Sequence, residues 1–186
     1  KTGVLGKVGR IEQHRNEWRP YWYNYVKEVR CEDVDWDEFL MDAPRRPFDA
    51  NLYSGWYGYR DYSDGAIPGF GSHFIDLVTY ITGAQFPLSS VCQGGTFTWN
   101  DDYKFTCPDH VQATWIYPEG FMVSYTTNCG NSGGDSFLIS GENGAIDLAN
   151  WEKPMLTGDG AGPNKACVAG PKMIDHVERP DHMLDW

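Results

Sequence analysis

A histidine and an aspartate stand three residues apart in the segment whose residue types suit chemistry. His73 and Asp76 follow the glycine-rich run 64–71, and a spacing of three places both on one face of a helix. A neutral imidazole can accept a proton from a hydroxyl or donate a hydrogen bond to a carbonyl oxygen, as alcohol–ketone interconversion requires. We therefore predict that His73 is catalytic and that Asp76 holds the imidazole or reaches a substrate hydroxyl.

The expected place of His73 in its helix adds to this hypothesis. Apolar residues at helical spacing predict a helix over 71–82, and Gly83 is typical of a helix C-terminus. An imidazole in the first turn lies at the positive end of the helix dipole, which favours its neutral form. The alternative is that His73 only caps the helix while Asp76 points into solvent.

A second group of candidate residues precedes the glycine-rich run. Trp56, Tyr59, Arg60 and Asp61 combine flat aromatic faces with a cation and a carboxylate, which suits the C–H patches and hydroxyls of a sugar. We predict that they bind substrate; the alternative is a packed loop core with a surface ion pair. The aromatic cluster at 18–22 is predicted either to line a pocket or to pack against the core or a partner.

The cysteine and histidine spacings argue against a metal site. The five cysteines are widely spaced, odd in number and form no CxxC motif, so neither a disulfide framework nor a zinc site is predicted. Free thiols indicate a reducing compartment, so the cytoplasm is the expected location and the periplasm the alternative. Four histidines lie among polar residues without the close spacing of metal ligands: His14, His110, His176 and His182.

The charge of the chain excludes one class of partner. The formal net charge is −11, from 26 acidic and 15 basic residues, and an acidic surface repels the phosphates of nucleic acids. No apolar run approaches the roughly 18 residues that a membrane span needs. The partners that remain are small molecules and other protein chains.

The remaining patterns predict an α+β domain over residues 1–150. Alternating residues from 89 onward predict successive strands, and the Asn-Gly at 143–144 predicts a tight hairpin. We expect an open antiparallel β-sheet with helices packed on one face, followed by an irregular tail over 151–186. The uncovered face is expected to expose Trp115, Tyr117 and Tyr125 for pairing with a second copy.

Several ordered segments resemble one known family. The run 65–77 resembles the "GG…GSHxxD" segment in the second domain of Gfo/Idh/MocA oxidoreductases, and the acidic–Trp run resembles a subgroup common in environmental bacterial genomes. The resemblance covers about residues 5–150, with a weaker similarity at 182–186. The other matching stretches, in the same order, are 32–40 with 46–49, 108–115, 117–121 and 141–146.

This resemblance implies the substrate-side, oligomer-forming domain of an NAD(P)-dependent dehydrogenase that acts on a sugar, glycoside or polyol. It implies that His73 lies beside the nicotinamide and the reacting carbinol, and that Asp76 contacts substrate. NAD or NADP would be bound mainly by an N-terminal Rossmann domain, and this sequence contains no strand–GxGxxG–helix unit. We therefore expect a partial chain that alone is inactive and binds no cofactor, ending where the family's closing helix begins.

The missing nucleotide-binding unit and one departure from the family pattern keep two alternatives open. Family members often carry an acidic, substrate-contacting residue where this chain has Gly69. The first alternative is a non-catalytic domain for sheet-mediated oligomerisation or carbohydrate binding. The second is a sugar lyase or hydrolase on the same scaffold.

Overall fold

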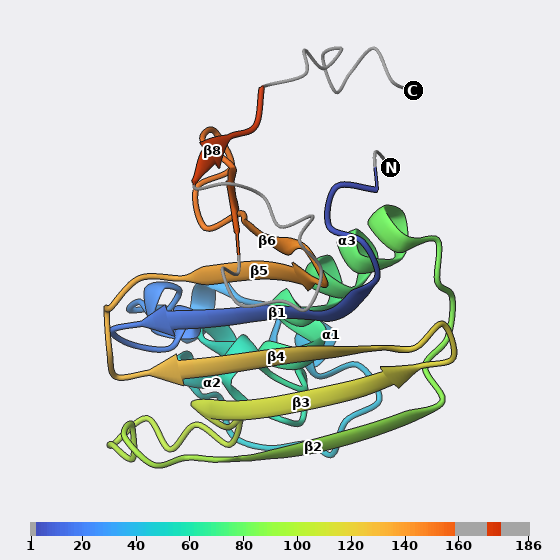
Figure 1. The fold of residues 1–186 in the computed structure, drawn as a ribbon. Coiled ribbons are helices and arrows are strands. Elements are labelled where there is room, and N and C mark those ends of the chain that lie inside the picture. The colour runs from blue at the N-terminus through green and yellow to red at the C-terminus, as the bar shows by residue number, and fades with distance from the viewer. Residues whose placement is uncertain (1–2, 159–170, 176–186) are drawn as a thin grey trace, which may run out of the picture.

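A mixed β-sheet organises the computed structural model, which describes residues 3–158 and 171–175. In that part of the chain the sheet has eight strands in the order β2-β3-β4-β1-β5-β6-β7-β8 (Figure 1). The strands are β1 (Val8–Glu17), β2 (Ser89–Gly95), β3 (His110–Tyr117), β4 (Phe121–Cys129), β5 (Ser136–Gly141), β6 (Gly144–Asp147), β7 (Met155–Thr157) and β8 (Lys172–Met173). The last two continue the sheet past residue 150, where the sequence predicted no element.

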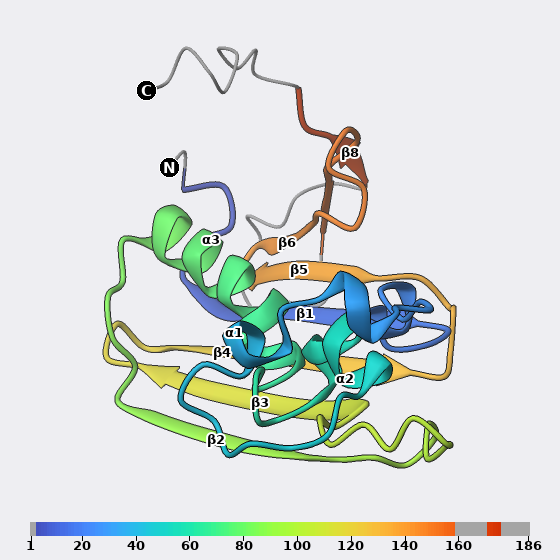
Figure 2. The same ribbon diagram turned by 180° about the vertical axis from the view of Figure 1, so that it is seen from behind.

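The helices gather on one face of this sheet, and the view from behind shows them covering it (Figure 2). They are α1 (Trp36–Leu40), α2 (Ala50–Ser54) and α3 (Ser72–Thr82), with 3-10 turns η1 (Tyr21–Asn24), η2 (Cys31–Asp33) and η3 (Trp56–Gly58) and the π turn η4 (Ile67–Gly71). The predicted α+β class is thus confirmed. Among the described residues no helix has the length and apolar character needed to cross a bilayer.

One strand pair makes the sheet mixed. β1 runs antiparallel to β5 but parallel to β4, with Arg10 opposite Met122 and Glu17 opposite Cys129. A parallel pair needs a crossover connection, and here the helical segments and β2 and β3 all lie between the two strands in sequence. Local sequence patterns carry no information about such a pairing.

Helix α3 provides the main packing contact with the sheet. Phe74 and Val78 are 2% and 0% exposed, and they belong to one core cluster with Ile11, Val123 and Tyr125. The predicted end of the helix is confirmed, because Gly83 is the left-handed C-terminal residue with φ 77° and its N–H donates to the Thr79 carbonyl. A second, smaller cluster beneath the loops contains Trp22, Tyr23, Phe105 and Cys107.

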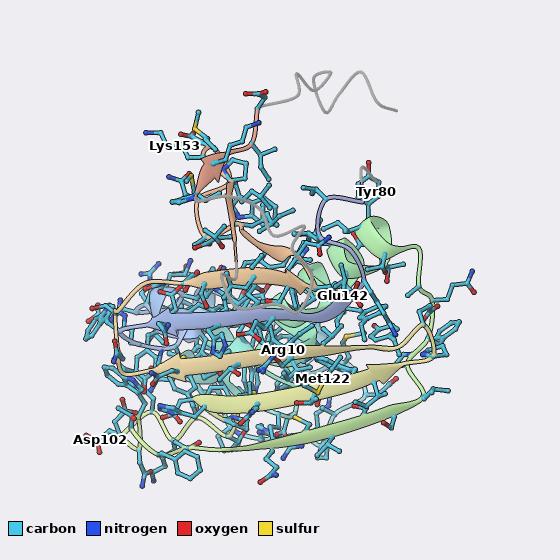
Figure 3. The ribbon with its side chains drawn as sticks, in the orientation of Figure 1. Arg10, Tyr80, Asp102, Met122, Glu142 and Lys153 are labelled. Carbon is cyan, nitrogen blue, oxygen red and sulfur yellow. The ribbon has the colours of Figure 1, made fainter. Side chains whose placement is uncertain are left out.

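The prediction of the exposed sheet residues was wrong. Tyr117 and Tyr125 are 2% and 0% exposed, and Trp115 packs against the same core as α3. Alternation shows which residues share a face, but a shift of one residue exchanges the two faces, so the pattern does not tell which one is covered. The uncovered face instead carries residues such as Arg10 and Met122, which are paired in the register of β1 and β4 (Figure 3).

A buried carboxylate stabilises the loop between β2 and β3 by hydrogen bonds. Asp109 is 1% exposed and accepts hydrogen bonds from the backbone N–H groups of Phe97, Thr98 and Trp99 at 2.7–2.9 Å. His110 Nδ1 lies 2.7 Å from the same carboxylate. Burial would raise the pKa of Asp109, but these hydrogen bonds outweigh it and hold the pKa below its usual value.

We expect Asp109→Asn to lower the free energy of unfolding by about 2–4 kcal/mol at pH 7, because the amide nitrogen would face donors instead of accepting from them. Since the folded-state pKa is lowered, the carboxylate's contribution is present above the unfolded pKa of about 4 and is lost as pH falls through the folded value. Urea unfolding of both proteins at pH 7 and pH 3 should therefore show the difference shrinking in acid. A difference that stays constant would contradict this account.

Candidate functional site

The helix that carries His73 starts earlier than the sequence predicted. Helical backbone begins at Ala66, passes through η4 and continues without a break into α3, with Gly71 and Ser72 in right-handed helical conformation. Pro68 fits here because a residue near a helix N-terminus needs no intrahelical N–H bond. His73 is therefore not in the first turn, and the helix dipole gives no reason for a neutral imidazole there, because its effect is confined to the terminal turn.

His73 and Asp76 do share a face of α3, as predicted. Both side chains are exposed, whereas Phe74 and Val78 on the opposite side are buried. No hydrogen bond joins the two side chains among those of the described residues, so Asp76 does not hold the imidazole in this structure. The roles of both residues stay predictions.

A pocket of about 410 Å³ lies beside the π turn. It brings Arg60 and Asp61, two of the predicted substrate residues, together with residues that the sequence interpretation did not select. Its lining residues are Arg60, Asp61, Tyr62, Ser63, Asp64, Pro68 and Gly69. The polar run 60–64 next to the glycine-rich segment was the available signal for the missed Asp64.

Two of the lining residues are tied to neighbouring loops. The carboxylate of Asp61 accepts a hydrogen bond from the Arg46 guanidinium at 2.8 Å, which raises the pKa of Arg46. The backbone N–H of Arg60 donates to the Thr106 hydroxyl at 2.7 Å, while the Arg60 side chain is exposed. The pocket rim is thus held in place by contacts that do not use the Arg60 guanidinium.

Tyr59 and Trp56, the other predicted substrate residues, do not line this pocket. The Tyr59 hydroxyl donates to the Tyr103 carbonyl at 2.7 Å, its ring packs on Phe105, and burial raises its pKa to about 12. Trp56 is half-buried and stacks on Tyr57, with ring centroids 3.8 Å apart. Both residues therefore pack within loops, and Arg46 and Asp61 form an ion pair. This arrangement is the alternative considered in the sequence analysis, a packed loop core with a surface ion pair.

The aromatic cluster at 18–22 divides between packing and surface. Trp22 is 1% exposed and belongs to the smaller core cluster, whereas Trp18 is 57% exposed and meets Trp99 edge-on. The sequence predicted that four histidines bind no metal, and two of them, His14 and His110, lie on β1 and β3. The other two, His176 and His182, lie outside the described residues, as does Cys167. The described residues contain no group of three or more side chains that could hold a metal ion.

Gly69 is a position where a side chain would collide with Tyr21. A Cβ at residue 69 would lie 2.6 Å from the Tyr21 hydroxyl and 3.6 Å from the ring carbon that bears it. The hydroxyl is buried without a hydrogen-bond partner among the described residues, and burial raises its pKa to about 12. The bare glycine thus lets Tyr21 pack against the π turn at the pocket wall.

Gly69→Ala is expected to lower the free energy of unfolding by about 1 kcal/mol, because the new methyl group would overpack against the Tyr21 hydroxyl. In a Tyr21→Phe background the same change should raise it by about 0.5–1 kcal/mol, since alanine favours helix and the nearest atom is then at ordinary contact distance. Urea unfolding of the four proteins in a double-mutant cycle measures this coupling. Equal effects of Gly69→Ala in both backgrounds would exclude the collision.

Comparison with protein families finds a match that extends over more than half of the chain. Residues 38–147 match the model described as "GFO/IDH/MocA C-terminal domain". The match includes the pocket residues, the π turn, α3 and strands β2 to β6. No relative was found among curated proteins.

Solved structures share the fold at low sequence identity. Levoglucosan dehydrogenase in complex with NADH and L-sorbose is 15% identical with a TM-score of 0.53, covering 92% of this chain and 41% of that one. The aldose-aldose oxidoreductase of Caulobacter crescentus, complexed with glycerol, is 16% identical with a TM-score of 0.55, covering 96% and 42%. An Agrobacterium radiobacter oxidoreductase in complex with NAD+, L-tartaric acid and magnesium is 13% identical with a TM-score of 0.53, covering 94% and 39%. The chain thus spans about two fifths of the length of the structures that it matches.

Proposed function

We propose that the chain is the substrate-side domain of an NAD(P)-dependent oxidoreductase acting on a sugar, glycoside or polyol. The chain belongs to the GFO/IDH/MocA family, because residues 38–147 match the C-terminal domain of that family. The observation that carries the proposal is the polar pocket with Arg60 and Asp61, which is lined in part by the π turn that continues into the helix with the exposed His73. Hydroxyl-rich ligands need both donors and acceptors, and this pocket offers both.

The proposal separates the tasks of this chain from those of a cofactor. The described residues contain no strand–glycine loop–helix unit that could cradle a dinucleotide, and we propose that NAD(P) is held mainly by a separate nucleotide-binding domain. A bound nicotinamide would supply the hydride acceptor. In this chain, the His73 imidazole would take the proton of the reacting hydroxyl, while Asp76 on the same helix face and the pocket residues position the substrate.

We expect His73→Ala to lower kcat by ~10²–10⁴-fold in a protein that joins this chain to a nucleotide-binding domain, as loss of a general acid–base does. Reduction of NAD(P)+ by a polyol, followed by absorbance, measures the effect. Ser72→Ala, at the neighbouring exposed position of α3, is the control and should retain activity. Full turnover by the His73 variant would remove this residue from the mechanism.

We also propose that the uncovered face of the sheet joins copies of the chain. Among the described residues no helix lies on this face, and its side chains are mostly uncharged and only partly exposed, which suits a self-complementary contact. These side chains include Glu12 and His14 of β1, Met122, Ser124, Thr126 and Asn128 of β4, and Gln112, Thr114 and Ile116 of β3.

Thr126→Arg should shift the chain to a monomer, because a long cation at the centre of the face would be desolvated or repelled by its own copy across a symmetric contact. Analytical ultracentrifugation of the wild-type and variant chains gives the oligomeric state. The control Gln85→Arg adds the same charge at an exposed position between α3 and β2 and should leave assembly unchanged. A wild-type chain that sediments as a monomer would rule out this contact.

A further inference from the structure

One edge of the sheet is open in the part of the chain that the structure describes. β2 is the first strand in the sheet order, so only its side toward β3 is paired (Figure 1). All of its residues except Gly95 are exposed. The outer N–H and C=O groups of such a strand are unpaired, and they can form a ladder with another strand.

This edge lacks the features that usually keep strand edges apart. Proteins protect open edges with lysine or other charged side chains, with proline, or with a covering helix or loop. β2 contains no charged residue and no proline, and the apolar side chain of Val91 on it is 62% exposed. The edge therefore suits pairing with another strand.

The distribution of charge favours a second copy of this chain as the partner. The net charge is −11, so two copies repel each other over most of their surface. Residues 77–100 contain no Asp, Glu, Lys or Arg, and β2 lies within this range. Two copies that meet along β2 bring no like charges of this segment together, whereas a basic partner would find no carboxylate on it to pair with.

The two ends of β2 carry groups that match in an antiparallel pair. Leu88, just before the strand, is 72% exposed, and Phe97, just after it, is 76% exposed. A Cβ at Gly95 would lie 2.6 Å from the Phe97 ring, so this ring lies over the end of the strand. An antiparallel copy places the start of one strand beside the end of the other. A two-fold pair would therefore bury Leu88 of each copy against Phe97 of the other.

We infer that β2 pairs antiparallel with β2 of a second copy, which joins two sheets edge to edge. With full overlap of Ser89–Gly95, the central residue Cys92 lies opposite Cys92 of the other copy. One short strand pair buries less surface than the roughly 1,200–2,000 Å² of stable interfaces, so the contact is weak in dilute solution. This contact does not use the uncovered face of the sheet.

The exposed thiol of Cys92 reports on this contact. Opposed residues of an antiparallel pair have Cα atoms about 4.5–5.5 Å apart, within the roughly 4.4–6.8 Å that a disulfide spans. The test uses the Thr126→Arg chain, so that the sheet face does not contribute. Oxygen with a copper–phenanthroline catalyst oxidises two thiols to one disulfide, and a non-reducing gel resolves the covalent dimer. We expect a dimer band that Cys92→Ser abolishes and that Cys31→Ser, at the other exposed cysteine of the described residues, retains.

A charge at the edge provides the matched control. Val91→Lys should slow cross-linking through Cys92 about tenfold or more, because pairing would desolvate two lysines close together. Met173→Lys makes a similar change on β8, at the other end of the sheet order, and should leave the rate unchanged. Each rate is divided by the rate at which a monofunctional thiol reagent labels Cys92, which corrects for its intrinsic reactivity. The absence of a Cys92-dependent dimer, or equal corrected rates in Val91→Lys and Met173→Lys, would overturn the inference and leave the edge to a different partner.

Cysteines at neighbouring positions test the register. In the Cys92→Ser background, full antiparallel overlap places residue 91 opposite residue 93 of the other copy. A mixture of Val91→Cys chains with size-tagged Gln93→Cys chains should therefore cross-link between the two kinds of chain faster than either kind cross-links with itself. Self-cross-linking that is faster than the mixed reaction would overturn this pairing.

Discussion

The packing of α3 on one face of the sheet is the contact on which the candidate site depends. Phe74 and Val78 are held against Val123 and Tyr125, and this fixes the helix relative to the strands. The π turn is continuous with α3, so the same contact sets the position of Gly69 at the pocket wall. Because one side of α3 is committed to the core, His73 and Asp76 are left on the side that faces away from it.

Much of the architecture followed from local patterns. The helical spacing of apolar residues and Gly83 located α3 and its end, and the alternation after residue 89 located the strands of the antiparallel part. Three features did not follow. The parallel pairing of β1 with β4 is a long-range contact, and the covered face of β3 and β4 depends on where the helices settle. The early start of the helix was hidden because glycine and proline in 65–71 are typical of loops, although both fit a π turn near a helix N-terminus.

The candidate site was predictable in part for similar reasons. Composition pointed to the run of polar and aromatic residues before the glycine segment, and Arg60 and Asp61 do line the pocket. The sequence could not show that Tyr59 bonds to Tyr103, since that contact joins residues 44 positions apart. Nor could it separate Asp61, balanced by Arg46, from Asp64, which has no ion-pair partner in the part of the chain that the structure describes. Residue type indicates what a side chain can do, but its availability depends on the partners that the fold brings to it.

The central place of β1 has a consequence for how the chain reaches this fold. Arg10 aligns with Met122, 112 residues later, so β1 has no strand partner until those residues have been made. Such distant pairings slow folding, and unpaired strand edges invite wrong partners in the meantime. During synthesis, the strand that later lies between β4 and β5 would be the segment most in need of protection from premature association.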